Sequence, residues 1–372
     1  MKDLTALAII ALLFPAQATI RDTARKRNNR IRLNRSSPLV PVSYATGQER
    51  NLNTKDYTPL RLLFKTDELE NAFEGKDNAT IAKGNAIINE VLPRVEKLFT
   101  NSLSVVPVPA LVIPGNICNG YFEVPTAWTK DVQGLPNTDL LVFVSAWSEI
   151  GQQQVCNTDD SKEVLSTLAV STACAVDPAT DRPVVGFANL CLNEIATTKN
   201  GTVDQASVDM MVDVLIHELL HVLGLDSDLF KYFRNSATGE PLTPRKATWM
   251  GSEAGFEKVE SVSCVGGQAP QQLAIACNNT LMYHREEVSL GVDKVRRSYY
   301  EIVLPTVVQV SRNQFNCQDL NGVRLENQPT SEDCFGSHFD ERTWYAELLS
   351  AVYDQSASGY LTPLTLAFLE GK

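Results

Sequence analysis

The pentapeptide His-Glu-Leu-Leu-His at residues 217–221 constrains this chain more than any other feature. Histidines four residues apart lie on one face of a helix, with their Cβ atoms about 5–6 Å apart. Both imidazoles can then reach a single Zn²⁺ ion at about 2.0–2.1 Å. Glu218 follows the first histidine, where its carboxylate can take a proton from a water on that ion. The pattern predicts His217 and His221 as zinc ligands and Glu218 as a catalytic base.

The residues around the motif predict that this helix is buried. Apolar side chains recur at helical spacing in the preceding segment, at Val208, Met211, Val212 and Leu215. Gly224 fits the end of the helix, because glycine adopts the left-handed conformation that ends many helices. A buried histidine pair beside a glutamate is costly without a compensating ion. Metal binding is therefore favoured over the alternative, two solvent-facing histidines on an ordinary helix.

The N-terminal residues indicate export from the cell. Lys2 precedes an apolar stretch at residues 4–14, and Ala16-Gln17-Ala18 offers the small residues of a cleavage site. The stretch is shorter than the about 20 apolar residues that cross a membrane. We predict a signal peptide at residues 1–18 and no transmembrane segment.

The cysteines and glycosylation sequons fit the same route. None of the 8 cysteines forms a Cys-x-x-Cys metal pair; they are Cys118, Cys156, Cys174, Cys191, Cys264, Cys277, Cys317 and Cys334. An even set behind a signal peptide favours disulfides, and Cys264 with Cys277 and Cys317 with Cys334 would close short loops. Sequons that predict a glycoprotein begin at Asn34, Asn78, Asn200 and Asn278.

Residues 19–57 form a basic leader that we interpret as a propeptide-like segment. Residues 1–57 carry a net charge of +6, so the remainder carries −17 within the total of −11. No cysteine precedes Cys118 to block a metal, and cleavage at residues 25–27 (Arg-Lys-Arg) would release the leader. The alternative is a solvated basic tail. A nucleic-acid partner is excluded, because the acidic body would repel phosphate.

Strand-like runs and one long helical pattern precede the zinc helix. Residues 80–99 have helical periodicity despite Pro93, and strand composition occurs at residues 60–65, 104–109, 139–145 and 184–191. This order predicts an α+β fold with a twisted mixed sheet and an active-site helix.

The last of these runs has two interpretations. As an edge strand, Gly186, Phe187 and Ala188 would pair with an extended substrate through main-chain hydrogen bonds. As an interior strand, the run would pack without touching substrate.

A third zinc ligand is needed, because catalytic zinc sites usually have three protein ligands and a water. Many peptidases with a longer motif place a histidine three residues after the glycine, but that position is Ser227. With 4 histidines in the chain, the remaining candidates are His284 and His338.

Several segments resemble the leishmanolysin family of zinc peptidases, from about Pro59 to the C-terminus. They are the zinc motif, residues 118–125 (CNGYFEVP), 137–139 (NTD), Arg182-Pro183 with Gly186 and Asn189, and residues 315–317 (FNC), 325–328 (LENQ), 336–338 (GSH), 358–362 (SGYLT) and 364–368 (LTLAF). The resemblance implies a two-lobed, zincin-like catalytic domain. Residues 58–226 would hold the zinc helix, and residues 227–372 would form a mostly helical or irregular lower subdomain. It assigns the third ligand of one Zn²⁺ ion to His338 and leaves His284 as a surface or structural residue.

The chain departs from the family pattern in two places. A methionine turn lies under the metal in the family, whereas the turn residue here is Leu349, in Glu347-Leu348-Leu349. Leucine for methionine nearly conserves volume and costs under about 1.5 kcal/mol, so we expect zinc binding to survive. The sequence ends at Lys372, before the cysteine-rich C-terminal domain of other members, which fits either a minimal secreted form or a truncated gene model.

The predicted function is that of a secreted zinc metalloendopeptidase, in which a zinc-bound water activated by Glu218 attacks the peptide bond. We expect a monomer that acts on proteins or peptides, either secreted into solution or associated peripherally with the cell surface. One alternative is a weak or inactive, zinc-stabilised cell-adhesion or binding protein of the same family. Another is a zinc hydrolase that acts on substrates other than peptides.

Overall fold

The computed structural model describes residues 26–27, 39–46, 57–130, 133–151, 153–156, 167–226, 228–243, 279–290, 293–326, 337–350, 352–353 and 359–370. Several predictions fall outside these residues: the signal peptide at 1–18, the sequons at Asn34 and Asn278, and any disulfide of Cys264, Cys277 or Cys334.

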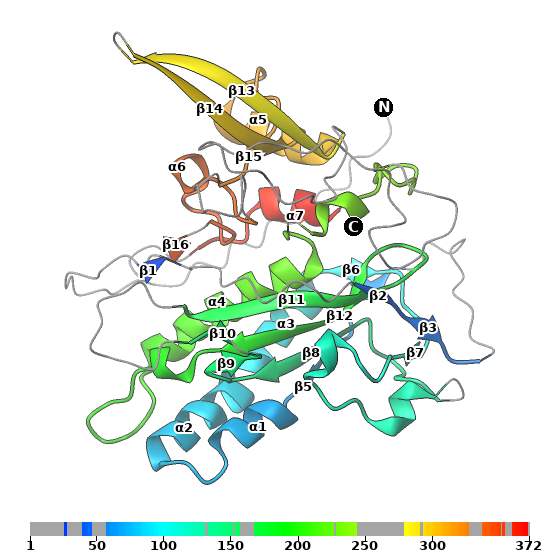
Figure 1. The fold of residues 1–372 in the computed structure, drawn as a ribbon, viewed down its shortest axis with the longest axis vertical. Coiled ribbons are helices and arrows are strands. Elements are labelled where there is room, and N and C mark those ends of the chain that lie inside the picture. Colours follow the sequence, from blue (N-terminus) through cyan, green and yellow to red (C-terminus); the bar gives the residue numbers. More distant parts are fainter. Residues whose placement is uncertain are drawn as a thin grey trace.

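Two largely apolar strands form the middle of the main sheet. β8 (Leu140–Ser145) and β12 (Pro183–Leu190) are buried along their whole length, as strands covered on both faces are. They belong to a five-stranded sheet of order β2-β11-β12-β8-β5 (Figure 1). The other strands are β2 (Val40–Pro41), β5 (Leu62–Lys65) and β11 (Ala169–Val176). Only β11 and β12 pair antiparallel within this sheet, so the predicted mixed sheet is confirmed.

Helices cover one face of this sheet. Alternate residues of β8, Leu140, Val142 and Val144, pack in one core with the helices. The helices are α1 (Asp67–Phe73), α2 (Asn78–Ala86), a π-helix η1 (Ile87–Val91), α3 (Leu92–Ser102) and α4 (Gln205–Leu223). The predicted helix at 80–99 is thus confirmed, and Pro93 is the second residue of α3, directly after the π-helix η1. No helix among the described residues combines the length and apolar character needed to cross a membrane.

The opposite face of the sheet carries an irregular layer held by disulfides. Leu141 and Phe143 face this second core, and Phe122 stacks on Phe143 with ring centroids 4.7 Å apart. Disulfides join Cys118 to Cys174 and Cys156 to Cys191. The layer contains the 3₁₀ turns η2 (Cys118–Gly120) and η3 (Thr126–Thr129) and the short strand pairs β3 (Ser43–Tyr44) with β7 (Leu111–Val112) and β9 (Glu149–Ile150) with β10 (Gln153–Gln154).

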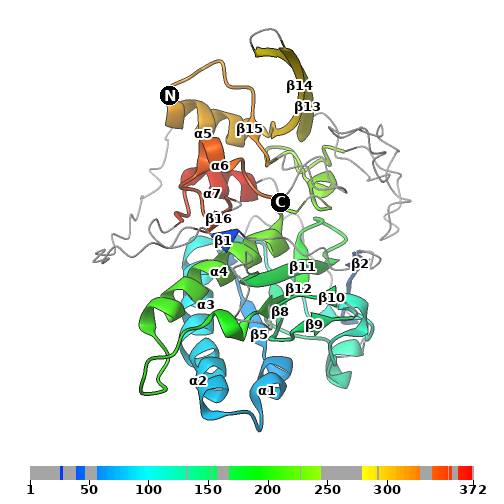
Figure 2. The same ribbon diagram turned by 60° about the vertical axis from the view of Figure 1, so that its left-hand side comes forward.

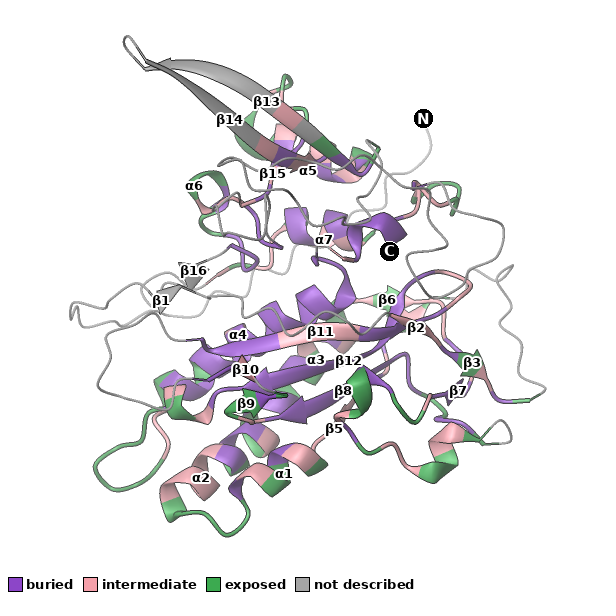
Figure 3. Ribbon diagram, in the orientation of Figure 1, coloured by how far each residue is buried: buried purple, intermediate pink, exposed green. Residues whose placement is uncertain are grey.

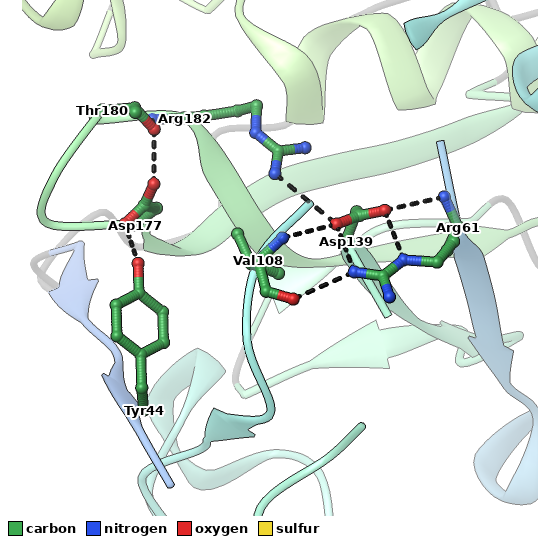
Figure 4. A network of polar contacts seen from close by, with 7 residues as sticks. All are labelled: Tyr44, Arg61, Val108, Asp139, Asp177, Thr180 and Arg182. Carbon is green, nitrogen blue, oxygen red and sulfur yellow. Dashed lines mark hydrogen bonds and ion pairs between the residues drawn. The ribbon is translucent and has the colours of Figure 1, made fainter. Parts of the chain in front are cut away.

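Part of the predicted leader is built into the body. Val42 and Ala45 are each 3% exposed, and β2 adds to the C-terminal end of β11. The hydroxyl of Tyr44 donates a hydrogen bond to Asp177 (Figure 4). Residues 39–46 therefore pack as a structural strap, a name we keep for this segment.

An ion pair between a half-buried arginine and a buried aspartate holds the start of the sheet to the irregular layer. Asp139 is fully buried and accepts hydrogen bonds from Arg61 Nε and Nη2, each 2.8 Å, and from the Val108 amide at 2.9 Å (Figure 4). Burial alone would raise the pKa of Asp139, but the Arg61 guanidinium and the amide hydrogen bonds hold that pKa below its ordinary value. The pair explains why an acid follows Asn137-Thr138 directly before β8.

The C-terminal part contains a long hairpin that the sequence did not predict. β13 (Leu281–Leu290) and β14 (Asp293–Ile302) pair antiparallel, and β15 (Val323–Arg324) adds to β14. The remaining elements are η4 (Leu192–Glu194), η5 (Phe230–Tyr232), α5 (Pro305–Phe315), α6 (Glu341–Trp344), α7 (Pro363–Leu369), and the strand pairs β1 (Lys26–Arg27) with β16 (Val352–Tyr353) and β4 (Thr58–Pro59) with β6 (Ser104–Val105). The prediction of a mostly helical or irregular subdomain did not include this hairpin, because charged residues interrupt the apolar alternation in both of its strands.

The order of the layers places the predicted site. In both views, α6 and α7 lie between the main sheet and the β13–β14 hairpin (Figures 1 and 2). The helix α4 lies on the side of the sheet that faces these C-terminal elements, and it is buried over most of its length (Figure 3). His217 and His221 therefore lie where the two parts of the chain meet. The two-lobed, zincin-like arrangement as such stays a prediction.

Candidate metal centre

Three histidines that are distant in sequence converge at the C-terminal half of α4. His217 and His221 come from α4, and His338 from the segment ahead of α6; their side chains form a cluster that could hold a metal ion. The Nε2 atoms lie 2.9 Å apart for His217 and His221, 3.1 Å for His217 and His338, and 3.2 Å for His221 and His338. All three residues are 2–5% exposed.

The outer nitrogen of each ring is held by a hydrogen bond. His217 Nδ1 lies 2.7 Å from the Leu348 carbonyl oxygen, and His221 Nδ1 lies 2.6 Å from the Leu225 carbonyl oxygen. His338 Nδ1 lies 2.6 Å from Glu326 Oε1. Carbonyl and carboxylate oxygens accept hydrogen bonds, so each Nδ1 must donate. The three Nε2 atoms are then left with lone pairs directed at one another.

This arrangement fits a bound cation. Three lone pairs about 3 Å apart repel and cannot hydrogen-bond to one another, and a positive centre between them would relieve that repulsion. A tetrahedral Zn²⁺ ion with bonds of 2.0–2.1 Å requires nitrogen–nitrogen distances of about 3.3 Å. The observed distances of 2.9–3.2 Å are close to that value.

Glu218 is fixed through its backbone on the same helix. Its side chain belongs to a residue only 5% exposed, and Ser171 Oγ on β11 donates a hydrogen bond to the Glu218 carbonyl oxygen at 2.9 Å. Gly186 on β12 permits this close packing, because a Cβ there would lie 2.5 Å from Val222 Cγ1 of α4. The sheet thus sets the position of the helix at the residue predicted to be the base.

The turn at residues 347–349 lies under the cluster, as the family resemblance implies. Leu349 is fully buried, and the Leu348 carbonyl holds His217. Glu347 is 2% exposed and accepts hydrogen bonds from the hydroxyls of Thr362 and Thr365. Burial raises the pKa of Glu347 to about 7, although the two hydroxyl hydrogen bonds oppose the rise.

The structure corrects the predicted substrate edge. β12, which contains Gly186, Phe187 and Ala188, lies between β11 and β8, so it is an interior strand. Among the described residues, β2 covers only Ala175 and Val176 of β11. Within the described part of the chain, the free edge is therefore residues 169–174 of β11. The sequence analysis missed this strand, because Ala-Val-Ser-Thr-Ala-Cys-Ala-Val contains three alanines, a residue type depleted in strands.

The other predicted histidine lies elsewhere. His284 is on β13, where its Nε2 lies 2.9 Å from Glu301 Oε2 and its ring stacks on Tyr299 with centroids 4.9 Å apart. It does not join the cluster. The sequence analysis also missed Glu326 and Ser171, although Glu326 stood within a segment similar to the family.

A buried helix with the His-Glu-x-x-His pattern, completed by a distant histidine into a three-nitrogen cluster, is the arrangement typical of metallopeptidases. The comparison of sequences gives the family. The chain belongs to the leishmanolysin family, because the sequence model of leishmanolysin matches residues 67–248 and 278–371.

Similar proteins carry related names. A leishmanolysin-like peptidase of Caenorhabditis elegans is 28% identical over 244 residues, which are 64% of this chain and 31% of that protein. A leishmanolysin-like peptidase of Drosophila melanogaster is 29% identical over 243 residues, 65% of this chain and 31% of that protein. A ciliated left-right organizer metallopeptidase of Xenopus laevis is 22% identical over 244 residues, 65% of this chain and 26% of that protein. The chain thus spans about a third of the length of the curated relatives that it matches.

Proposed function

We propose that this chain is a secreted zinc metalloendopeptidase that hydrolyses peptide bonds within proteins. One observation carries the proposal: three buried Nε2 atoms meet at 2.9–3.2 Å, with each Nδ1 engaged outward, beside a glutamate on the same helix. A purely structural metal site has no need of that glutamate. The name of the family and of its relatives supports peptide hydrolysis.

The ligand set favours zinc. Three neutral imidazoles with an open fourth position are the protein ligands of several catalytic zinc sites, whereas carboxylate and carbonyl oxygens suit magnesium, calcium and manganese. His217, His221 and His338 would hold the ion. When bound, it supplies a Lewis acid that acidifies water and stabilises negative charge on the carbonyl oxygen.

Glu218 moves the proton during the reaction. Its carboxylate accepts the proton from the attacking water and then gives that proton to the leaving amine. Ser171 keeps the base in place by holding the backbone of Glu218 against the sheet. The low exposure of this part of α4 excludes bulk water, which strengthens each electrostatic interaction there.

The substrate would bind along the free edge of β11. Among the described residues, β2 pairs with the outer edge of β11 only at Ala175 and Val176, so residues 169–174 are open there, and Ser171 Oγ in this stretch donates to the Glu218 carbonyl oxygen. An extended peptide added to this edge would run past the base and be held by main-chain hydrogen bonds. The zincin-like arrangement of two lobes around such a peptide belongs to the same proposal.

Casein zymography of the purified full chain tests the proposal. We expect clearing of casein, loss of clearing with a zinc chelator, and recovery when zinc is added back. The same experiment addresses the alternative of a zinc-stabilised binding protein, which would retain zinc without clearing casein. Clearing that persists in chelator-treated, zinc-free protein would refute the metallopeptidase.

A further inference from the structure

A short antiparallel ladder positions His338 in the cluster. Leu325 and Phe339 form an antiparallel bridge. On one side of it, the Glu326 amide donates to the His338 carbonyl at 2.9 Å; on the other, the Asp340 amide donates to the Arg324 carbonyl at 2.9 Å. Because β15 pairs with β14, the third histidine is carried on the edge of the hairpin sheet.

The same two residues also interact through their side chains. His338 Nδ1 donates to Glu326 Oε1 at 2.6 Å, so backbone and side chain join Glu326 to His338 at two points. Two contacts of this kind fix both the position of the ring and its rotation. The side chains are 3% exposed for His338 and 15% for Glu326, which limits screening of the carboxylate charge by water.

This partner differs in charge from those of the other two histidines. His217 and His221 donate to backbone carbonyls, which no side-chain substitution can remove. His338 donates to a carboxylate. A carboxylate behind a metal-bound imidazole fixes the tautomer, makes the ring a stronger ligand, and typically changes metal affinity by 10–100-fold when it is lost.

We propose that Glu326 is the positioning residue that sets the metal affinity of this site, acting through His338. This inference rests on the proposed function, since it takes the cluster to be a zinc site. Glu326 does not touch the metal or the substrate; its negative charge and its hydrogen bond act on the ligand. Of the three Nδ1 hydrogen bonds described above, the one that a side-chain substitution can change therefore lies on the histidine that is most distant in sequence.

The neighbouring ion pair of the ladder supplies a matched control. Arg324 Nε lies 3.0 Å from Asp340 Oδ2, and the Arg324 guanidinium also lies over the Tyr299 ring at 4.5 Å. Arg324→Gln removes a charged partner from the same ladder without removing a contact to the ring of His338. If loss of Glu326 weakened zinc binding only by loosening the ladder, Arg324→Gln should weaken it as well. If Glu326 acts specifically on the ring of His338, Arg324→Gln should leave zinc binding unchanged.

The test is the zinc dissociation constant of the full chain, measured by competition with a zinc indicator. We expect Glu326→Gln, which keeps an acceptor but loses the charge, to bind zinc at least 10-fold more weakly, with Arg324→Gln within about 2-fold of wild type. The visible spectrum of the Co²⁺-loaded protein should shift for Glu326→Gln and not for Arg324→Gln. If Glu326→Gln does not fold, Glu326→Asp replaces it, because its shorter side chain draws the charge away from Nδ1 and should also weaken zinc.

Two outcomes overturn the inference: zinc affinity within 2-fold of wild type in the Glu326 variant, or an equal loss in Arg324→Gln. Failure of the proposed function looks different. In that case the wild-type chain itself would bind no stoichiometric zinc or would not cleave casein, whatever the Glu326 variant does.

Discussion

His217 Nδ1 donates a hydrogen bond to the Leu348 carbonyl oxygen across 2.7 Å, joining α4 to the turn beneath it. The contact uses the backbone of the turn, so it does not depend on which side chain follows at position 349. The side chain of Leu349 fills the space below the cluster and is fully buried. This separation of roles explains how the family's turn methionine can be replaced.

Substitutions at Leu349 should separate packing from metal binding. We expect Leu349→Met to retain stoichiometric zinc and to change the free energy of unfolding by under about 1.5 kcal/mol, because the volume is nearly conserved. Leu349→Ala should lower that free energy by about 2–5 kcal/mol, because it leaves a cavity. Chemical denaturation with zinc analysis checks both; loss of zinc in Leu349→Met would contradict this account of the turn.

Glu347 should make stability depend on pH. Its folded-state pKa of about 7 lies above the ordinary value of 4.5, so the folded chain binds more protons than the unfolded chain between these values. Stability contributed by this group is therefore full below about pH 4.5 and is lost as pH rises through 7, by on the order of 3 kcal/mol. The free energy of unfolding of Glu347→Gln minus that of wild type should become more positive from pH 5 to pH 8, because the wild type loses stability as Glu347 ionises. A difference that stays flat over this range would show that Glu347 is not a buried neutral acid.

Gly186 should be required for the packing of α4 against the sheet. Gly186→Ala places a Cβ 2.5 Å from Val222 Cγ1 and 3.0 Å from the Thr172 carbonyl oxygen, which should cost about 1–3 kcal/mol. Gly115→Ala is the control, since no atom lies within 4 Å of a Cβ there. Adding Val222→Ala should restore part of the loss measured by thermal unfolding. Equal stability of the two single alanine variants would argue against the close approach.

The strap at residues 39–46 should remain with the folded body after any processing of the leader. A chain that begins at Leu39 should unfold at a temperature close to that of the longer chain. A chain that begins at residue 47 should lose several degrees, because it loses the buried Val42 and Ala45 and the hydrogen bond from Tyr44 to Asp177. Differential scanning fluorimetry compares them, and matching melting temperatures would show that the strap adds nothing.

The sequence predicted best where periodicity and chemistry coincide. The helix of residues 207–223, the strand within residues 139–145 and the α+β order follow from apolar spacing that local rules can read. β11 was missed because serine, threonine and cysteine interrupt its apolar run. The edge position could not be read for β12, because strand order depends on which segments pair across the fold and not on the composition of one of them.

The surroundings of the histidines also divide into features that the sequence predicts and contacts that only the structure shows. The spacing of His217 and His221 fixes their common face, but Leu225 and Leu348 act through backbone carbonyls, which leave no trace in residue type. Glu326 lies twelve residues from His338, and only the ladder between them brings the two together. Contacts made by the backbone or set by register had to come from the structure.

The most direct test of this account is the rate of casein hydrolysis per bound zinc in Glu218→Gln, with His284→Ala as the matched control. The account predicts that Glu218→Gln keeps stoichiometric zinc and loses at least about 100-fold in rate, because general acid–base catalysis contributes about 10²–10⁴-fold. His284→Ala, whose ring pairs with Glu301 away from the cluster, should keep both zinc and rate. A zinc-loaded Glu218→Gln protein that hydrolyses casein at the wild-type rate would contradict the account.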